Sequence, residues 1–304
     1  FLEFLHFSYC DMRNANTRNL VQLHFVIFIF GFTSILGELI SINSVALVWY
    51  RMLIASIILG SYVLILKKDN LKLDRRLSFR LLLAGALIAL HWVAFFEAIK
   101  LVGISITLSM LSSAALFTAF LEPIFYKRKL LLCELFFGAL AFVGMLLIYN
   151  TSPEGWLGIL IAIVAAALAA LFTLLNGKLI THKPPSIITF YEMLVGTFCI
   201  SIYLFFTAGF NNDFFNLSNN DILWLIILGS LCTAYAINVA TAVMKTISPF
   251  SVMLTVNLEP VYGIILAFLI FGEDQLMDTN FYIGLIIIIL AVLLNSIYKS
   301  NKLK

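Results

Sequence analysis

The sequence predicts an all-α membrane protein with ten transmembrane helices in two inverted five-helix repeats and with both termini in the cytoplasm. The first observation behind this prediction is the composition. Of the 304 residues, 62% are hydrophobic and 12% are charged, a balance far from that of soluble domains. The second observation is the distribution of Lys and Arg, and the third is an internal repeat. Because one crossing takes about 20 apolar residues, the chain has room for roughly ten crossings with short loops.

Ten apolar runs, separated by charged residues or by clusters of Gly, Pro and Asn, predict the crossings in chain order. They span residues 19–40, 45–66, 81–100, 104–126, 131–149, 156–178, 186–207, 222–244, 248–271 and 281–298. The first five form one repeat, 19–149, and the last five form the other, 156–298. Residues 1–18 are expected to be a cytoplasmic segment in which Met12 is the natural start and 1–11 are an upstream extension, and residues 299–304 a cytoplasmic tail.

The basic residues assign a side to each loop. With the N-terminus inside, 17 of the 19 Lys and Arg residues fall in cytoplasmic segments, while Lys100 lies outside and Arg51 lies within a crossing. The outer segments 150–155, 208–221 and 272–280 contain no Lys or Arg, and the last one carries Glu273, Asp274 and Asp278. Cytoplasmic loops of membrane proteins carry this excess of positive charge, so both termini are predicted to face the cytoplasm.

Similar residues recur at a slowly drifting offset along the two halves. Thr33 and the run Gly37–Ile40 match Thr173 and Gly177–Ile180 at an offset of 140 residues, and Tyr50-Arg51-Met52-Leu53 matches Tyr191-Glu192-Met193-Leu194 at 141. Further along, Lys100 pairs with Lys245 at 145. A duplicated five-helix unit explains these matches. Because five is odd, the second unit enters the membrane from the opposite side, which is a plan frequent among secondary transporters.

Four charged residues lie within the predicted hairpins of the two halves. Glu38 and Arg51 flank the first turn at similar distances, and Lys178 and Glu192 flank the corresponding turn around Pro185. A charge in the bilayer is costly without a partner, so we predict two ion pairs, Glu38–Arg51 toward the outside and Lys178–Glu192 toward the inside. The pairs are read either as staples of each hairpin, as polar gates or substrate anchors, or as side chains that reach the interface separately.

Two ionisable residues, His91 and Glu259, are placed near the middle of the bilayer by their positions in the third and ninth crossings. A carboxylate at that depth beside Pro260 marks a functional site, whereas a histidine on an apolar helix is either a satisfied core residue or part of a cavity wall. The side chains expected to line a substrate cavity are His91, Trp92, Tyr235, Asn257 and Glu259. Glu122 precedes a proline as Glu259 does, but the repeat register places it nearer the cytoplasmic end.

Several function classes lack their signatures in the sequence. The four cysteines are widely spaced and form no cluster with histidines, so no metal site is predicted. The phosphate-binding loop GxxxxGK[ST], the HExxH motif and the GxSxG motif are all missing, which argues against ATP-driven transport by this chain and against the commonest hydrolases. We therefore expect no enzyme activity, no cofactor and no nucleic-acid partner.

The residues that break the apolar pattern resemble a known family. The stretch Gly31-Phe32-Thr33, the run Asn257-Leu258-Glu259-Pro260-Val261-Tyr262-Gly263 and the turn Phe271-Gly272-Glu273 are similar to those of EamA-type members of the drug/metabolite transporter superfamily. The resemblance covers about residues 20–298. It implies a bacterial inner-membrane carrier that exports amino acids or related metabolites, with a central cavity between the halves and peripheral fifth and tenth helices. Lys127-Arg128 departs from the family pattern, in which a Gly-Glu turn often follows the fourth crossing as well.

The predicted function is therefore secondary transport of a small metabolite, with an amino acid as the expected substrate and alternating access as the mechanism. Protons are a predicted coupling partner through Glu259 and His91, the lipid bilayer is the second partner, and the protein is expected to act as a monomer or homodimer. Two alternatives stay open. A lipid or isoprenoid-carrier translocase would have a cavity open sideways to lipid, and a structural or sensory protein would have a dry interface between the halves.

Overall fold

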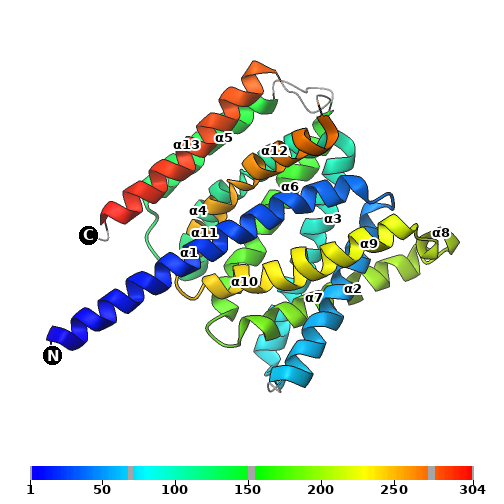
Figure 1. The fold of residues 1–304 in the computed structure, drawn as a ribbon, viewed down its shortest axis with the longest axis horizontal. Helices are drawn as coiled ribbons and strands as arrows, with labels where there is room; N and C mark the ends of the chain where they lie inside the picture. The colour runs from blue at the N-terminus through cyan, green and yellow to red at the C-terminus, as the bar shows by residue number, and fades with distance from the viewer. Residues whose placement is uncertain (1, 68–70, 150–154, 273–277, 303–304) are drawn as a thin grey trace.

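The computed structural model describes the backbone of residues 2–67, 71–149, 155–272 and 278–302, and these residues contain helices and no strand. The first half contains α1 (Leu2–Leu39), α2 (Ser44–Ser61) with the π-helical turn η1 (Tyr62–Lys67), α3 (Arg75–Leu111), α4 (Ala114–Tyr126) and α5 (Leu132–Tyr149). The second half contains α6 (Trp156–Leu179), α7 (Pro185–Phe206), α8 (Asn212–Phe215), α9 (Asn219–Gly229), the π-helical turn η3 (Ser230–Tyr235), α10 (Ala236–Val243), α11 (Pro249–Val256), α12 (Glu259–Phe271) and α13 (Thr279–Lys302). The helices form one bundle, and both chain ends lie on its left in Figure 1.

Seven segments of the described residues are long and apolar enough to cross a membrane. They are Arg18–Leu39, Ser44–Ile65, Arg75–Leu111, Trp156–Leu179, Pro185–Phe206, Asn219–Val243 and Pro249–Phe271. Three shorter apolar helices, Ala114–Tyr126, Leu135–Gly144 and Thr279–Ala291, accompany them. The protein is therefore a multi-pass membrane protein. The sequence assigns Glu273 and Asp274 to an outer loop, but both lie outside the described residues.

α3 is two helices joined at a glycine. Its 37 residues would extend about 55 Å as one straight helix, which is well beyond the roughly 30 Å hydrocarbon core of a bilayer. Gly103 has φ 79° and ψ 170°, a conformation that glycine adopts without the steric penalty of a Cβ. The chain therefore turns at Gly103, which lies between the sequence-predicted crossings 81–100 and 104–126.

The last crossing before the peripheral helix is interrupted in each half. Residues 104–111 are followed by a turn at Ser112 and Ser113 before α4 begins, and α11 is followed by a turn at Asn257 and Leu258 before α12 begins. The two breaks are related by the same offset of 145 residues that relates Lys100 to Lys245. Broken helices at membrane depth place helix ends and free backbone groups inside the protein, where a cavity or a buried side chain must satisfy them.

The remaining packing separates a central group of helices from a peripheral pair. α5 and α13 lie side by side along the upper left of the bundle in Figure 1, and a Cβ on Gly144 of α5 would lie 2.6 Å from the Gly284 carbonyl oxygen of α13. In the centre, α3 and α6 pack against each other extensively. The small side chains Ala165, Ala166 and Ala169 of α6 are buried there, because small residues let two helix backbones approach closely.

Candidate functional site

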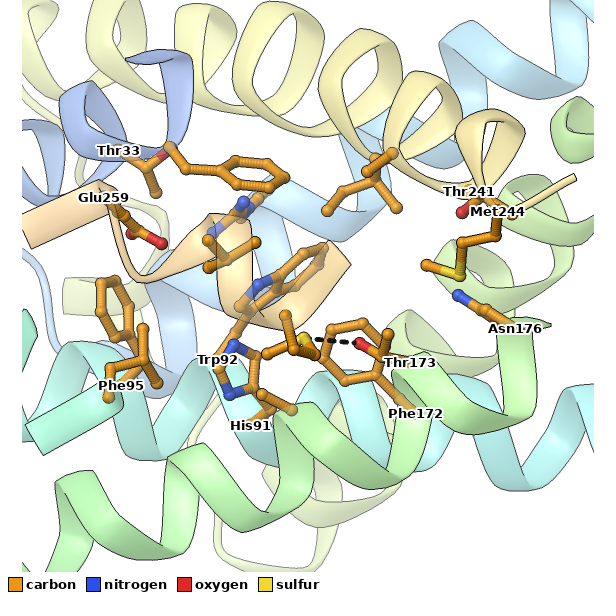
Figure 2. A pocket seen from close by; sticks show the side chains of 18 residues that line it. Thr33, His91, Trp92, Phe95, Phe172, Thr173, Asn176, Thr241, Met244 and Glu259 are labelled. Atoms are coloured by element: carbon orange, nitrogen blue, oxygen red, sulfur yellow. Dashed lines mark hydrogen bonds between the residues drawn. The ribbon is translucent and has the colours of Figure 1, made fainter. Parts of the chain in front are cut away.

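A cavity lies among helices from both halves of the chain. The space between its atoms, including open solvent at its mouth, is about 720 Å³. The lining side chains are Phe30 and Thr33 of α1, Arg51 of α2, His91, Trp92, Phe95 and Leu111 of α3, Ala169, Phe172, Thr173 and Asn176 of α6, Ile237, Ala240 and Thr241 of α10, Met244 after it, Met253 and Val256 of α11, and Glu259 of α12. Glu259, Thr33 and Phe95 lie toward one end in Figure 2, and Asn176, Thr241 and Met244 lie toward the other.

Among the described residues that line this cavity, Arg51 is the only arginine or lysine. The residue is 1% exposed, and its Nε donates a hydrogen bond of 2.6 Å to the Thr233 hydroxyl while Nη2 donates one of 3.4 Å to the Cys232 carbonyl. Its guanidinium carbon lies 3.7 Å from the centre of the Trp92 ring, a cation–π contact that is strongest when desolvated. Nη1 is buried without a hydrogen-bond partner. Arg51 is therefore held in place with its Nη1 group still free to donate.

Glu259 supplies the opposite charge. It is the first residue of α12, directly after the break at Asn257 and Leu258, and it is buried in the cavity wall. Arg51 and Glu259 are close enough to interact electrostatically, although they do not approach within the 4.0 Å of an ion pair; the described residues contain such a pair at Arg128 and Glu122, 3.4 Å apart. A buried charge is costly without compensation. The charges of Arg51 and Glu259 offset each other only partly, so each can still bind an oppositely charged group of a ligand.

The rest of the cavity wall is mainly aromatic and apolar. The His91 ring is oriented by a 2.8 Å contact of Nδ1 with the Ala165 carbonyl oxygen. A carbonyl can only accept, so Nδ1 carries a hydrogen in this contact. The ring also lies 5.4 Å from that of Phe172. Figure 2 shows His91, Trp92 and Phe172 together on one side of the cavity.

The end of the cavity away from Glu259 has uncharged polar groups. Thr173 donates to the Met253 sulfur at 3.2 Å, as drawn in Figure 2. Asn176 lies beside it, and its Oδ1 is buried without a hydrogen-bond partner. Sequence reasoning missed Asn176, because an asparagine in an apolar helix carries no motif. Thr33 and Thr173 were visible as a repeat match, and the structure places both in the cavity wall.

Contacts between the halves close the bundle near the α1–α2 turn. Asp221 of α9 accepts hydrogen bonds of 2.8 Å from both the backbone N–H and the hydroxyl of Ser41. Tyr50 of α2 donates at 3.1 Å to the Phe214 carbonyl of α8, and the two rings are stacked 5.1 Å apart. Trp49 packs edge-on against the same Phe214 ring. Three hydrogen bonds and an aromatic cluster therefore join the two halves at this end.

The opposite end, near the α6–α7 turn, has an equivalent bond between the halves. Tyr191 of α7 donates at 2.8 Å to the Leu71 carbonyl, which precedes α3. Tyr50 and Tyr191 are the residues matched at an offset of 141 in the repeat, so the two bonds are related by the internal repeat and lie at opposite ends of the bundle. Glu122 adds a bond between the halves there, since it accepts the Phe250 backbone N–H at 2.8 Å.

The structure corrects the two ion pairs predicted from sequence. Arg51 faces Thr233 and the cavity, while Glu38 is exposed. Lys178 lies 5.2 Å from the Phe125 ring, and Glu192 is buried with neither carboxylate oxygen hydrogen-bonded. The prediction assumed that equal height on antiparallel helices brings the partners together. In each pair, however, the cation and the carboxylate are directed to different sides of their hairpin.

Two of the five predicted cavity residues lie elsewhere. Tyr235 is 45% exposed and packs edge-on against Phe25. It ends the π-helical turn η3, and the extra residue in such a turn rotates the following side chains out of the α-helical register. Asn257 is buried at the helix break with Nδ2 unpartnered but does not line the cavity. His91, Trp92 and Glu259 do line it.

Comparison with known proteins gives the family of this chain. The sequence model of the EamA-like transporter family matches twice, at residues 20–150 and 156–297. The chain belongs to the EamA-like transporter family. The two matches coincide with the halves defined by the internal repeat. The resemblance drawn from the sequence is thereby confirmed, and the protein is a membrane transporter of two repeats.

Curated relatives of this EamA-like transporter carry transporter names. An uncharacterized transporter of Bacillus subtilis (strain 168), YxxF, is 24% identical over 282 residues, covering 90% of this chain and 88% of that one. An uncharacterized transporter of Clostridium kluyveri is 25% identical over 226 residues, covering 66% and 71%. A protein of known crystal structure matches with a TM-score of 0.72 at 12% identity, covering 93% of this chain and 98% of that one. This last likeness concerns the fold alone.

Proposed function

We propose that this EamA-like transporter is an alternating-access carrier of zwitterionic small metabolites, with amino acids that have apolar side chains as its substrates. The observation that carries the proposal is the pair Arg51 and Glu259 in the wall of one cavity. The free Nη1 of Arg51 suits a carboxylate, because a guanidinium donates strong charge-assisted hydrogen bonds to that group. Glu259 suits the ammonium group of the same molecule.

The apolar remainder of the cavity supports the choice of side chain. Trp92, Phe172, Ile237 and Met253 line it beyond the two charged groups. Such a wall gains free energy by removing apolar surface from water, at about 25 cal/mol per Å². This part of the wall has no charged group that could pair with a charged substrate side chain. We therefore expect leucine-like and phenylalanine-like amino acids to bind better than lysine or aspartate.

The two tyrosine bonds support alternating access. Tyr50–Phe214 and Tyr191–Leu71 join the halves at opposite ends, and the cavity lies between those ends. Inverted repeats give a carrier two equivalent conformations, in which rocking of the halves opens one end at a time. In the proposed cycle, one tyrosine bond breaks while the other is kept, and the substrate meets Arg51 and Glu259 from either side.

The proposed setting is the inner membrane of a bacterium, with ten crossings, inverted halves and both termini in the cytoplasm. The excess of Lys and Arg in the segments assigned to the cytoplasm supports this orientation. It places the Tyr50 bond at the outer face and the Tyr191 bond at the cytoplasmic face. A monomer or homodimer is proposed, and no cofactor takes part.

Transport by the purified protein in liposomes tests the proposal. Labelled leucine, phenylalanine, lysine and aspartate are supplied singly to liposomes preloaded with the unlabelled compound, with and without an imposed pH gradient. We expect exchange of leucine and phenylalanine that is lost in Arg51→Met. Exchange of none of the four by the folded protein would refute the amino-acid proposal. Transfer of fluorescent lipids between leaflets would then favour a lipid or isoprenoid-carrier translocase.

A further inference from the structure

Glu192 of α7 is a buried carboxylate to which the proposed substrate contacts assign no role. Its side chain is 0% exposed, and neither carboxylate oxygen has a hydrogen-bond partner. The amide of Asn176 on α6 lies next to the carboxylate and interacts with it, but Asn176 Oδ1 also has no hydrogen-bond partner. Because Asn176 lines the cavity, as Figure 2 shows, Glu192 is separated from the substrate space by one side chain.

No cation pairs with Glu192 among the described residues, as the helices around α7 show. α7 packs against α2, α3 and α10. α10 carries no charged residue, and α3 meets the Glu192 backbone at Gly85. Three charged or titratable side chains of α2, α3 and α6 are engaged elsewhere: Arg51 by Thr233 and Glu259, His91 by the Ala165 carbonyl, and Lys178 by the rings of Phe125 and Tyr126.

An ionised carboxylate in these surroundings would be a buried charge with no counter-ion among the described residues and with the Asn176 amide as its one neighbouring donor, which is a costly arrangement in a protein. The neutral acid removes the charge and adds one O–H donor. That donor has an acceptor beside it, since Asn176 Oδ1 needs a hydrogen and an amide side chain can turn either end toward a neighbour. The Thr189 hydroxyl, one helical turn before Glu192, is buried without a partner as well.

The position of Glu192 in the repeat is a second, independent observation. Tyr191-Glu192-Met193-Leu194 matches Tyr50-Arg51-Met52-Leu53, so Glu192 occupies the place in the second half that Arg51 occupies in the first. Each follows the tyrosine that closes its end of the bundle. Arg51 reaches the cavity directly, and Glu192 reaches it through Asn176. The repeat thus provides one fixed cation and one carboxyl group at matching positions in the transport path.

We infer that Glu192 is a proton-binding site whose occupancy is communicated to the substrate through Asn176, an inference that rests on the transport function proposed above. With the proton bound, the Glu192 O–H donates to Asn176 Oδ1, and the amide NH₂ faces the cavity as a donor. When the proton leaves, the carboxylate accepts from that NH₂, and the amide turns its oxygen to the cavity. Proton loss therefore replaces a donor by an acceptor in the cavity wall and weakens the binding of a carboxylate there.

Infrared spectroscopy of the full-length protein in liposomes tests the proton site without any substrate. A protonated carboxyl group in an apolar environment has a C=O stretching band separate from those of ionised carboxylates. We expect this band in the wild type and in the matched control Glu259→Gln at neutral pH, and its loss in Glu192→Gln. If the band persists in Glu192→Gln, or if Na⁺ rather than protons alters it in the wild type, the inference is wrong. Should Glu192→Gln fail to fold, Asn176→Leu serves as the test variant. We expect this variant to keep the C=O band of protonated Glu192 but to shift its position, because the hydrogen bond from Glu192 to Asn176 is lost. An unshifted band would overturn the inference.

Exchange measurements then test the coupling to the substrate. In the wild type, we expect leucine exchange to fall as the pH is raised through the range in which the infrared band disappears. Glu192→Gln should exchange leucine equally well throughout that range, because its amide cannot lose a proton. A wild-type pH response in this variant would overturn the inference. If no amino acid were exchanged, the proposed function would fail, whereas the infrared result would still decide whether Glu192 binds a proton.

Discussion

Substitution of Arg51 tests the proposed substrate contact most directly. The guanidinium is fixed by Thr233, by the Cys232 carbonyl and by the face of Trp92, and these contacts leave Nη1 as the donor for a substrate carboxylate. Arg51→Lys keeps the charge but loses the planar fork and its fixed direction. Arg51→Met loses the charge while keeping an apolar stem against Trp92. The two variants therefore separate the charge from the geometry.

The expected magnitude follows from the one donor at issue. A hydrogen bond to a charged group contributes about 1.5–3 kcal/mol, which corresponds to about a tenfold to a 150-fold change in a dissociation constant. We expect Arg51→Lys to weaken leucine binding toward the lower figure and Arg51→Met toward the upper one. Leucinamide has no carboxylate, so its affinity should change far less.

The assay is binding of leucine and leucinamide to the purified variants, with thermal unfolding as a control for folding. The decisive quantity is the ratio of the two affinities, because a general loosening of the cavity lowers both. A folded Arg51→Met protein that discriminates leucine from leucinamide as well as the wild type does would refute the assignment of Arg51 to the carboxylate. The double variant Arg51→Met with Glu259→Gln should show a coupling energy of about 0.5–3 kcal/mol, as residues that share one ligand do.

Three further predictions follow from other contacts. Glu259→Gln should weaken leucine binding about tenfold or more but leave the binding of isocaproate, which lacks the ammonium group, unaffected. The control Glu122→Gln should lower the unfolding temperature without changing the preference for leucine over isocaproate. Equal effects of Glu259→Gln on both ligands would contradict the role of Glu259. Tyr50→Phe and Tyr191→Phe each remove one bond between the halves, at opposite ends of the bundle. Each variant should raise the labelling rate of cysteines introduced at the end where its bond is lost. Labelling changes at the same end in both variants would be inconsistent with alternating access. Gly144→Leu should clash with the Gly284 carbonyl and destabilise the α5–α13 pair by about 1–3 kcal/mol, measured by thermal unfolding, while a folded variant keeps leucine affinity.

The all-helical class and the two repeats were readable from the sequence because a bilayer imposes strict requirements. Every backbone group within it must be satisfied, so long apolar runs become helices, and the repeat was visible in a few polar and glycine matches such as Tyr50 with Tyr191. Glu259 was identifiable for the same reason, since a carboxylate at that depth is rare enough to be noticed.

Side-chain direction was the part that the sequence did not determine. The sequence predicts similar heights for Arg51 and Glu38, but height alone does not fix which side of the helix each one faces. Tyr235 was misplaced because nothing in Ser230–Tyr235 announces a π-helical turn, and that turn rotates its side chain away from the cavity. Asn176 was missed because its role depends on its neighbour Glu192 of α7 and on its place in the cavity wall, which local patterns do not encode.

The interrupted helices have a consequence for how this protein diverged after its duplication. Both halves keep the break at the same repeat position, but one is formed by Ser112 and Ser113 and the other by Asn257 and Leu258. The same backbone break is thus formed by different residues in the two halves. Only the second break is followed by a carboxylate, Glu259, while the first is followed by Ala114. A symmetric scaffold accordingly carries an asymmetric chemistry, because a carboxylate follows this break in the second half alone.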